Sequence, residues 1–233
     1  MDALFKFSGV RCGGSDRAFT FTLHAGETRL LQLASKHEKN AMIDSAIGEA
    51  VCGTGSIEIV RGDRRQSKAG AIGKLGERRH NSGPMPLIWQ PVSASRPGRV
   101  AWVAAHGGLI SNLKIWENVT LPQWYHARRD VIATEQSVKH WLPLLGLEPG
   151  DFAGFMAAQP HGIEPWQRKV AGLLRALLQM APVLVVDATL FEDVNARLAN
   201  CWIMALGSCA AEGRTVLAIA DRPTALPWEK LGE

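Results

Sequence analysis

The sequence predicts an α/β fold, and three observations carry this prediction. Short apolar stretches alternate with longer stretches of helical periodicity from one end of the 233-residue chain to the other. The stretch VLVVD, Val183 to Asp187, is apolar up to its last residue, which is typical of a strand inside a parallel sheet covered on both faces. At 46% hydrophobic residues, the chain can bury the core of one large domain or of two small lobes.

The same alternation assigns the elements in order. The start, MDALFKFSGV, alternates apolar and polar residues and has no long apolar run behind a basic start, so we expect a strand and not a signal peptide. The further strands that we expect are Phe19 to Leu23, Thr28 to Leu33, Ser56 to Val60, Val100 to Ala105, Val183 to Asp187 and Thr215 to Ala220. The expected helices are Asn40 to Val51, Ile115 to Leu147 with breaks at Pro122 and Pro143, Pro165 to Met180, and Asn195 to Ala211.

Composition narrows the class of protein. The chain lacks an unbroken apolar stretch of about 20 residues, so we expect no segment that spans a bilayer. Four cysteines (Cys12, Cys52, Cys201 and Cys209) are scattered without a CxxC pair, which favours buried free thiols over a metal site or a disulfide. A cytoplasmic protein is the resulting expectation.

The positive charge is concentrated in one stretch. Residues 61–99 hold nine basic side chains against Asp63 and Glu77, so this stretch carries +7 while the rest of the chain carries −3. It is rich in Gly, Ser and Pro, which predicts a loop or hairpin inserted in the fold. Two interpretations stay open: a solvated insertion, or a surface for nucleic acid or anionic lipid headgroups.

Two segments carry a resemblance to a known family. One is RVAWVAAHGGLISNLKIWENVTLP, a strand and loop followed by Glu117-Asn118-Val119; the other is LLRALLQMAPVLVVDA, in which a helix with Arg175 precedes the strand that ends at Asp187. Together they resemble the nucleotide-binding domain of ABC transporters, where this spacing links the signature helix to the strand with the magnesium aspartate. The segment GGLISNLKIWENVTLP is most similar to the ATPases of lipid transporters that work with MCE proteins.

The resemblance implies a P-loop NTPase-like, RecA-like sandwich with a helical subdomain, the architecture of ABC ATPases. It implies a single domain over residues 1–233, with a core of 1–105 and 176–233. The helical subdomain would cover about 107–175, and 61–99 would be a basic insertion.

The phosphate loop of that family reads G-x-x-x-x-G-K-[ST], because glycine lets backbone N–H groups wrap phosphates and Lys neutralises them. The register here gives Leu33 to Asn40, in which only Lys39 survives. Glu38 brings a like charge toward a polyanion, and two unit charges 4 Å apart repel by about 4 kcal/mol at an effective dielectric of 20. Asn40 offers Mg²⁺ a carbonyl oxygen in place of the usual hydroxyl.

At most of the remaining nucleotide-site positions, too, the residue that the resemblance leads one to expect is replaced. Asp187 stands where Mg²⁺ is held through water, although an acid at a strand end can also simply cap the next turn. Ala188 replaces the neighbouring carboxylate, and losing a general base costs about 10²- to 10⁴-fold in rate. Of the signature L-S-G-G-Q, Ile163 to Gln167 keep only Gln167. Ala105 replaces the glutamine that ligates Mg²⁺, and Asp221 replaces the switch histidine.

We therefore expect a pseudo-ATPase: a subunit with no catalytic residue and no metal site, in which Ala105, Ala188 and Asp221 mark lost positions. No cofactor is expected, and ATP with Mg²⁺ would bind only through residual contacts of Lys39, Asn40, Asp187 and Gln167. The expected partners are an integral membrane permease and a second ATPase-type subunit, with no specific nucleic acid. The chain would lie on the inner face of the cell membrane. Trp116, Trp124 and Tyr125 are candidate permease contacts, although the favoured interpretation of these three residues is a role in the core.

Two alternatives remain open at this stage. One is an atypical but active NTPase that uses Lys39, Asn40 and Asp187. The other is a cytosolic binding module that uses the basic stretch on nucleic acid or lipid.

Overall fold

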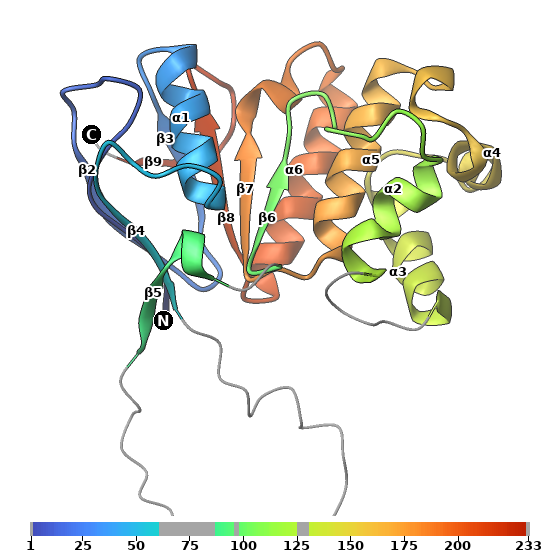
Figure 1. Ribbon diagram of the computed structural model, residues 1–233. Helices are drawn as coiled ribbons and strands as arrows, with labels where there is room; N and C mark the ends of the chain where they lie inside the picture. The colour runs from blue at the N-terminus through green and yellow to red at the C-terminus, as the bar shows by residue number, and fades with distance from the viewer. Residues whose placement is uncertain (1, 61–86, 96–97, 125–130, 232–233) are drawn as a thin grey trace, which may run out of the picture.

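The computed structural model describes residues 2–60, 87–95, 98–124 and 131–231, and it contains two sheets (Figure 1). The antiparallel sheet has the order β2-β1-β4-β5. Its strands are β1 Ala3–Arg11, β2 Phe19–His24, β4 Thr54–Val60 and β5 Trp89–Pro91. The second sheet has the order β6-β7-β8-β3-β9, and all its neighbouring strands are parallel. Its strands are β6 Val100–Val103, β7 Val183–Asp187, β8 Thr215–Ala220, β3 Thr28–Gln32 and β9 Glu229–Leu231.

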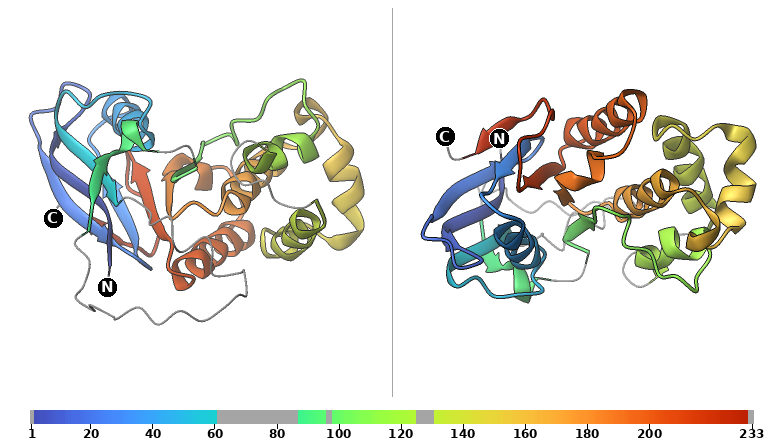
Figure 2. Two further views of the ribbon diagram at one scale, coloured as in Figure 1. Left: turned by 60° about the horizontal axis from the view of Figure 1, so that its bottom comes forward. Right: turned by 90° about the horizontal axis from the view of Figure 1, so that it is seen from above.

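Helix α1, Lys36–Ile47, lies between the two sheets (Figure 2). Its buried residues Met42, Ile43 and Ala46 share one core cluster with Phe5 and Phe7 of the antiparallel sheet. The same cluster contains apolar residues from one face of the parallel sheet (Val183, Val185, Leu217 and Ile219). Burial of this apolar surface from three elements fixes α1, and therefore Lys39, against the ends of β7 and β8.

Helices α5, Pro165–Leu178, and α6, Ala196–Ala211, cover the other face of the parallel sheet. Leu184 and Val186 of β7 belong to the core cluster on this face, while Val183 and Val185 belong to the cluster around α1. All five residues of β7 are buried, and β7 is an inner strand of the sheet. The prediction that VLVVD forms a strand inside a parallel sheet covered on both faces is therefore confirmed.

The remaining helices gather beyond α5, at the end of the molecule away from the antiparallel sheet (Figures 1 and 2). They are α2 Ile115–Pro122, α3 Val131–Leu144 and α4 Phe152–Ala157. Short 3-10 turns are η2 Val92–Ala94, η4 Pro149–Asp151, η5 Pro160–Gly162 and η6 Ala188–Phe191. The predicted break at Pro143 is displaced slightly, because α3 runs through Pro143 and ends at Leu144.

The largest error of the sequence prediction concerns α1. We expected this helix over Asn40 to Val51, but it spans Lys36–Ile47. The Ser35 hydroxyl accepts the N–H of Glu38 and so starts the helix four residues earlier, while Gly48 ends it with φ of 85°. Residues that we predicted in a phosphate-binding loop therefore form the first turn of a helix.

Two other expectations concern the cysteines and the basic stretch. The four cysteines are free; Cys12 and Cys209 are buried as expected, whereas Cys52 and Cys201 are half-buried. Burial raises the pKa of the Cys12 thiol to about 11. Residues 61–86 and 96–97 of the basic stretch, and Tyr125, lie outside the described residues.

Candidate functional site

The candidate site lies where β7 and β8 end and α1 begins. In open α/β sheets, ligands bind at the carboxyl ends of the parallel strands. Asp187 is the last residue of β7, Asp221 directly follows β8, and Lys39 lies in the first turns of α1. The fold therefore brings together three of the residues that the sequence singled out, from positions up to 182 apart in the chain (221 − 39).

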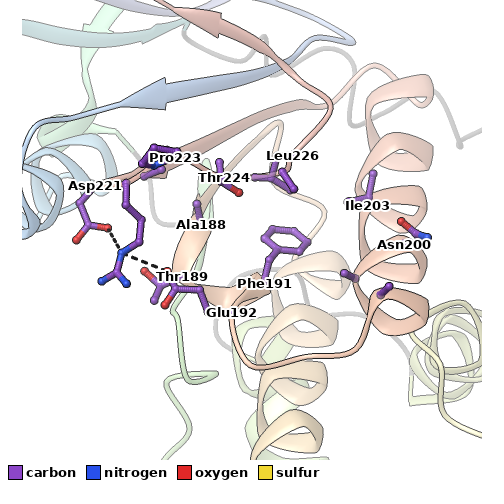
Figure 3. Close-up of a pocket in the computed structure, with 15 residues that line it drawn as sticks. Ala188, Thr189, Phe191, Glu192, Asn200, Ile203, Asp221, Pro223, Thr224 and Leu226 are labelled. Carbon is purple, nitrogen blue, oxygen red and sulfur yellow. Dashed lines mark ion pairs between the residues drawn. The ribbon is translucent and has the colours of Figure 1, made fainter.

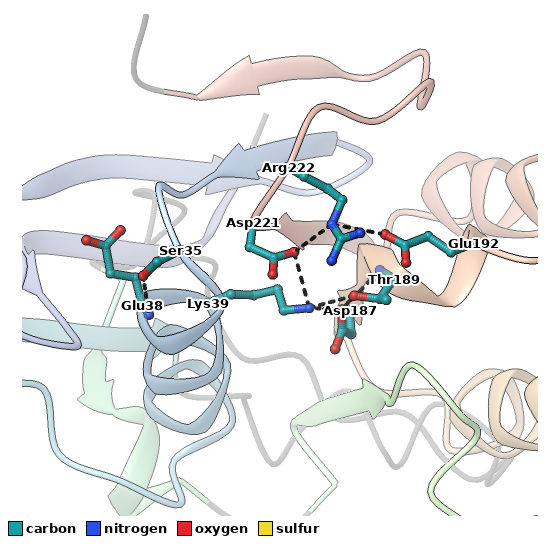
Figure 4. A network of polar contacts seen from close by, with 8 residues as sticks. All are labelled: Ser35, Glu38, Lys39, Asp187, Thr189, Glu192, Asp221 and Arg222. Atoms are coloured by element: carbon teal, nitrogen blue, oxygen red, sulfur yellow. Dashed lines mark hydrogen bonds and ion pairs between the residues drawn. The ribbon is translucent and has the colours of Figure 1, made fainter.

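Lys39 is surrounded by oxygen atoms of this protein (Figure 4). Its side chain is only 3% exposed. Its Nζ donates to Asp187 Oδ1 at 3.0 Å and to Thr189 Oγ1 at 2.5 Å, and it lies 3.5 Å from Asp221 Oδ1. Two of the three donors of the ammonium group are thus hydrogen-bonded, and Asp221 adds an ion pair. We call Lys39, Asp187, Thr189 and Asp221 the Lys39 network.

Asp187 has two roles in this network. Its Oδ1 accepts the backbone N–H of Thr189 at 3.0 Å and the Thr189 hydroxyl at 2.7 Å. The carboxylate thus caps η6, as one of the two sequence interpretations held, and it also pairs with Lys39. The sequence interpretation missed Thr189 as a member of the site, although a threonine two residues after an aspartate is a local hydrogen-bonding pattern.

The start of α1 is closed by its own side chains. The loop from β3 to α1 consists of Leu33, Ala34 and Ser35. Ser35 Oγ, at the N-cap, accepts the Glu38 N–H at 3.2 Å, and Glu38 Oε2 accepts the Ala34 N–H from the preceding loop at 3.0 Å. A Cβ on Gly13 would lie 2.8 Å from the Glu38 Cα, so the β1–β2 loop packs directly on this helix start. Phosphate binding at a helix start needs free N–H groups, and the N–H groups of Ala34 in the loop and Glu38 in the first turn are already bonded within the chain.

Other predicted positions do not reach the network. Asn40 is exposed on α1, on a different side of the helix from the buried Lys39. Gln167 accepts the Glu164 N–H at 3.0 Å and so forms part of the capping box at the start of α5. Ala105 is half-buried in the turn after β6. Ala188 directly adjoins Asp187 and is 5% exposed, and its methyl group carries no acid–base chemistry.

A second ion pair borders the Lys39 network. Arg222 Nε lies 3.5 Å from Glu192 Oε1 and 3.9 Å from Asp221 Oδ1. The two cations Lys39 and Arg222 thus stand beside three carboxylates, which leaves the cluster at −1 (Figure 4). Lys169 of α5 donates to the Glu192 backbone oxygen at 2.5 Å, and burial lowers the pKa of its amine. A net negative charge disfavours a polyphosphate at this position.

A pocket of about 380 Å³ adjoins the network on the side of α6 (Figure 3). Its lining includes Ala188 and Thr189 of η6, Asn200 and Ile203 of α6, and the segment 220–226 after β8. Within the described ranges, no group of three or more His, Cys, Asp or Glu side chains is arranged to hold a metal ion. Within the same ranges, every helix is too short or too polar to cross a membrane.

Comparison with known proteins locates the fold. The chain matches no family model, and no curated protein matches its sequence. Among solved structures, the ATP-binding subunit of an ABC transporter superposes with a TM-score of 0.66 at 16% identity, covering 93% of this chain and 79% of the other. The dimeric post-hydrolysis state of the ATP-binding cassette MJ0796, bound to ADP and Pi, gives 0.63 at 14% identity over 94% and 88%. The protein cbiO1 from Clostridium perfringens, part of the ABC transporter complex cbiONQ, gives 0.62 at 14% over 95% and 80%.

These similarities confirm the predicted fold, since each neighbour is aligned over more than nine-tenths of this chain. The chain has the architecture of ABC ATP-binding subunits. What its own side chains do at the nucleotide position is a separate question, which depends on the Lys39 network and the start of α1.

Proposed function

We propose that this chain is a pseudo-ATPase, a subunit with the fold of an ABC ATP-binding subunit that docks on a membrane permease without hydrolysing ATP. The observation that carries the proposal is the position of Lys39. Its ammonium group is buried and already neutralised by Asp187 and Asp221, so it is not available to neutralise phosphate.

A phosphate that binds Lys39 would have to break the Lys39 network, and this costs free energy. Separating a buried cation from its carboxylate costs about 3–5 kcal/mol, which corresponds to roughly a 100- to 4,000-fold loss of affinity for any ligand that needs Lys39. The closed start of α1 adds to this cost, because the Ala34 and Glu38 N–H groups are already bonded to Glu38 and Ser35. The residues present do not fit Mg²⁺ and ATP, so we expect neither to bind at physiological concentration.

Hydrolysis would fail for reasons of its own. Ala188 cannot position or deprotonate a water molecule, and Ala105 cannot ligate Mg²⁺. Asp221, at the switch position, is an acceptor already engaged by Lys39, where a γ-phosphate needs a donor. Any ATP hydrolysis in a complex with this subunit would therefore come from its partner.

The proposed partners are an integral membrane permease and a second ATPase-type subunit, as a homodimer or heterodimer. MJ0796 is described as dimeric and cbiO1 as part of a transporter complex, which supports partners of this kind. The end of α2 and the start of α3 offer an apolar surface for the permease, where Trp124, Val131 and Ile132 are 66%, 58% and 64% exposed. Trp116, by contrast, packs against the core. We place the protein in the cytoplasm, peripheral on the inner face of the membrane.

Lipid as the transported substrate is the most specific part of the proposal, and it rests on the segment GGLISNLKIWENVTLP alone. Part of this segment has a role in folding. Asn118 is fully buried, accepts the Ile110 N–H and donates to the backbone oxygens of Ile110, Leu113 and Lys114. The likeness to ATPases of MCE-type lipid transporters therefore includes residues that shape the loop before α2.

Binding and hydrolysis of ATP test the proposal directly. Titration of the pure protein with a fluorescent ATP analogue and Mg²⁺ should give no saturation below about 1 mM, and phosphate release should equal the buffer blank. Lys39→Ala should change neither result. Micromolar binding with phosphate release that Lys39→Ala abolishes would instead establish the active NTPase. Affinity purification from membranes should recover an integral membrane protein and a second ATPase-type subunit; recovery of neither contradicts the docking role.

A further inference from the structure

The pocket beside the Lys39 network is open because small side chains line it. Five alanines contribute to its wall, from η6, α6, the last residue of β8 and the segment after it: Ala188, Ala196, Ala199, Ala220 and Ala225. Phe191, Ile203 and Leu226 supply the larger apolar surface (Figure 3). A volume of about 380 Å³ falls in the range of pockets that hold small organic molecules.

Ala188 lies between this pocket and the Lys39 network. It directly follows Asp187, and its buried methyl group forms part of the pocket wall. A carboxylate at position 188 would place a charge in this wall, whereas alanine leaves it apolar. The alanine side chain at position 188 therefore makes the interior of the pocket suitable for apolar atoms.

The polar groups around the pocket indicate an uncharged ligand. Arg222 Nε lies 3.5 Å from Glu192 Oε1, and Asp221 lies 3.5 Å from the Lys39 ammonium, so each charged group that faces the pocket has a partner of opposite sign, while the net charge of −1 of the cluster disfavours an anion. Asn200, exposed on α6, and Thr224, on the segment after β8, are neutral groups that can donate and accept hydrogen bonds. The lining thus combines apolar walls, paired charges and two neutral polar side chains.

The wall of the pocket is held by a fixed aromatic cluster. The Phe191 ring lies 6.2 Å from that of Trp202 and 6.3 Å from that of Trp228, measured between centroids. Trp202 is fully buried, and its indole N–H donates to the Leu145 backbone oxygen at 3.1 Å. Such a wall keeps its shape without a ligand, which lowers the entropic cost of binding.

We infer that this pocket binds a small uncharged molecule of mainly apolar surface that carries one hydroxyl or amide group. The apolar part would lie against Phe191, Ile203 and Leu226, and the polar group would face Asn200 and Thr224. This inference does not depend on the proposed function, because none of the lining residues needs nucleotide, permease or a second subunit.

The neutral fluorescent probe N-phenyl-1-naphthylamine tests the inference. Its fluorescence should rise on addition of the full-length protein and saturate. Ala199→Phe places a ring in the pocket and should weaken binding at least tenfold. The matched control is Met204→Phe, which adds the same ring on the same helix at a position that is 71% exposed, and it should bind as the wild type does.

Two further measurements keep the inference falsifiable. Ala196→Phe enters the pocket from the exposed start of α6, so it reports on the site if Ala199→Phe fails to fold. The anionic probe 1-anilinonaphthalene-8-sulfonate should bind at least tenfold more weakly than the neutral probe. The inference is overturned if the neutral probe does not bind, if both pocket variants bind it as tightly as Met204→Phe does, or if the anionic probe binds more tightly.

Discussion

The Lys39 network and the junction between α5 and the loop after β6 are both built at carboxyl ends of parallel strands, but from different kinds of contact. The network joins α1 to the ends of β7 and β8 through side-chain charges. At the junction, backbone meets backbone: a Cβ on Gly172 would lie 2.5 Å from the Gly107 Cα, and one on Gly107 would lie 2.1 Å from the Arg168 oxygen. Arg175 then donates to the backbone oxygens of Gly108 at 2.8 Å and Gly107 at 3.1 Å.

The difference indicates which contacts of this fold tolerate an exchange of side chains and which do not. The partners of a charged side chain can change without a change of fold. A lysine that lacks a phosphate partner, for example, can pair with carboxylates of the same chain. A contact between two backbones leaves no such freedom, since any Cβ would overlap the neighbouring chain. We therefore expect that removal of one charged side chain from the Lys39 network lowers the free energy of unfolding most. At the junction, we expect that the added volume of even a methyl group destabilises the protein.

The largest effect is expected for Lys39→Met, which removes the cation and leaves Asp187 and Asp221 in a buried site without it. Breaking a buried ion pair on one side costs about 3–5 kcal/mol of the free energy of unfolding. Urea unfolding followed by tryptophan fluorescence measures this loss. Lys36→Met, at the exposed start of the same helix, should cost about 0.5 kcal/mol or less. A loss below about 1 kcal/mol for Lys39→Met would mean that the network does not hold α1 in place.

The next effect concerns the junction and compares two helical glycines. Gly172→Ala in α5 forces a methyl group against Gly107 and should destabilise the protein by about 2–3 kcal/mol. Gly207→Ala in α6 meets nothing within 4 Å and should be neutral or stabilise by up to about 1 kcal/mol, because alanine is the better helix former. Thermal unfolding of the two variants should thus shift in opposite directions or by clearly different amounts. Equal shifts would contradict the close backbone approach.

Comparison of these regions also explains what the sequence could predict. The strand VLVVD was predictable because a run of apolar residues is a property of the chain itself, and burial on both faces follows from it. The start of α1 was mispredicted because family register placed a loop at Leu33 to Asn40, while the local capping signal of Ser35 and Glu38 starts the helix at Lys36. Local hydrogen bonding sets this boundary, and the pattern of a serine followed three residues later by a glutamate, which predicts such bonding, is present in the sequence.

The members of the site were predictable to different degrees. Lys39, Asp187 and Asp221 were identified from family register, and the structure brings them together. Their mutual pairing was not predictable, because it depends on the distance between three strand and helix ends. The pocket could not be predicted for the same reason: its alanines come from three segments that are adjacent only in the folded chain.

An intermediate effect is expected for Arg175→Met, which keeps the apolar stem but removes two charged hydrogen bonds to the loop after β6. Hydrogen bonds from charged groups are worth about 1.5–3 kcal/mol, so a loss of about 2 kcal/mol is expected in urea unfolding. Arg197→Met is the control, since Arg197 forms an exposed 3.5 Å pair with Glu148, and its loss should cost about 0.5 kcal/mol or less. Equal losses of the free energy of unfolding for the two variants would mean that the hydrogen bonds of Arg175 do not stabilise the junction.

The smallest effect is expected for Ser35→Ala, which removes the N-cap side chain at the start of α1. Loss of the bond from the Glu38 N–H to Ser35 should cost about 1 kcal/mol, measured by urea unfolding. Ser208→Ala is the control within a helix. The Ser208 hydroxyl donates to the Met204 backbone oxygen of its own helix, so alanine should be neutral or slightly stabilising. Because Lys39 would still be paired with Asp187 and Asp221, ATP with Mg²⁺ at 1 mM should not restore the stability of Ser35→Ala. If ATP with Mg²⁺ does raise the free energy of unfolding of Ser35→Ala, then the Ser35 cap, and not the pairing of Lys39, is what keeps phosphate from binding. The start of α1 would then take the place of the Lys39 network as the region that decides nucleotide binding.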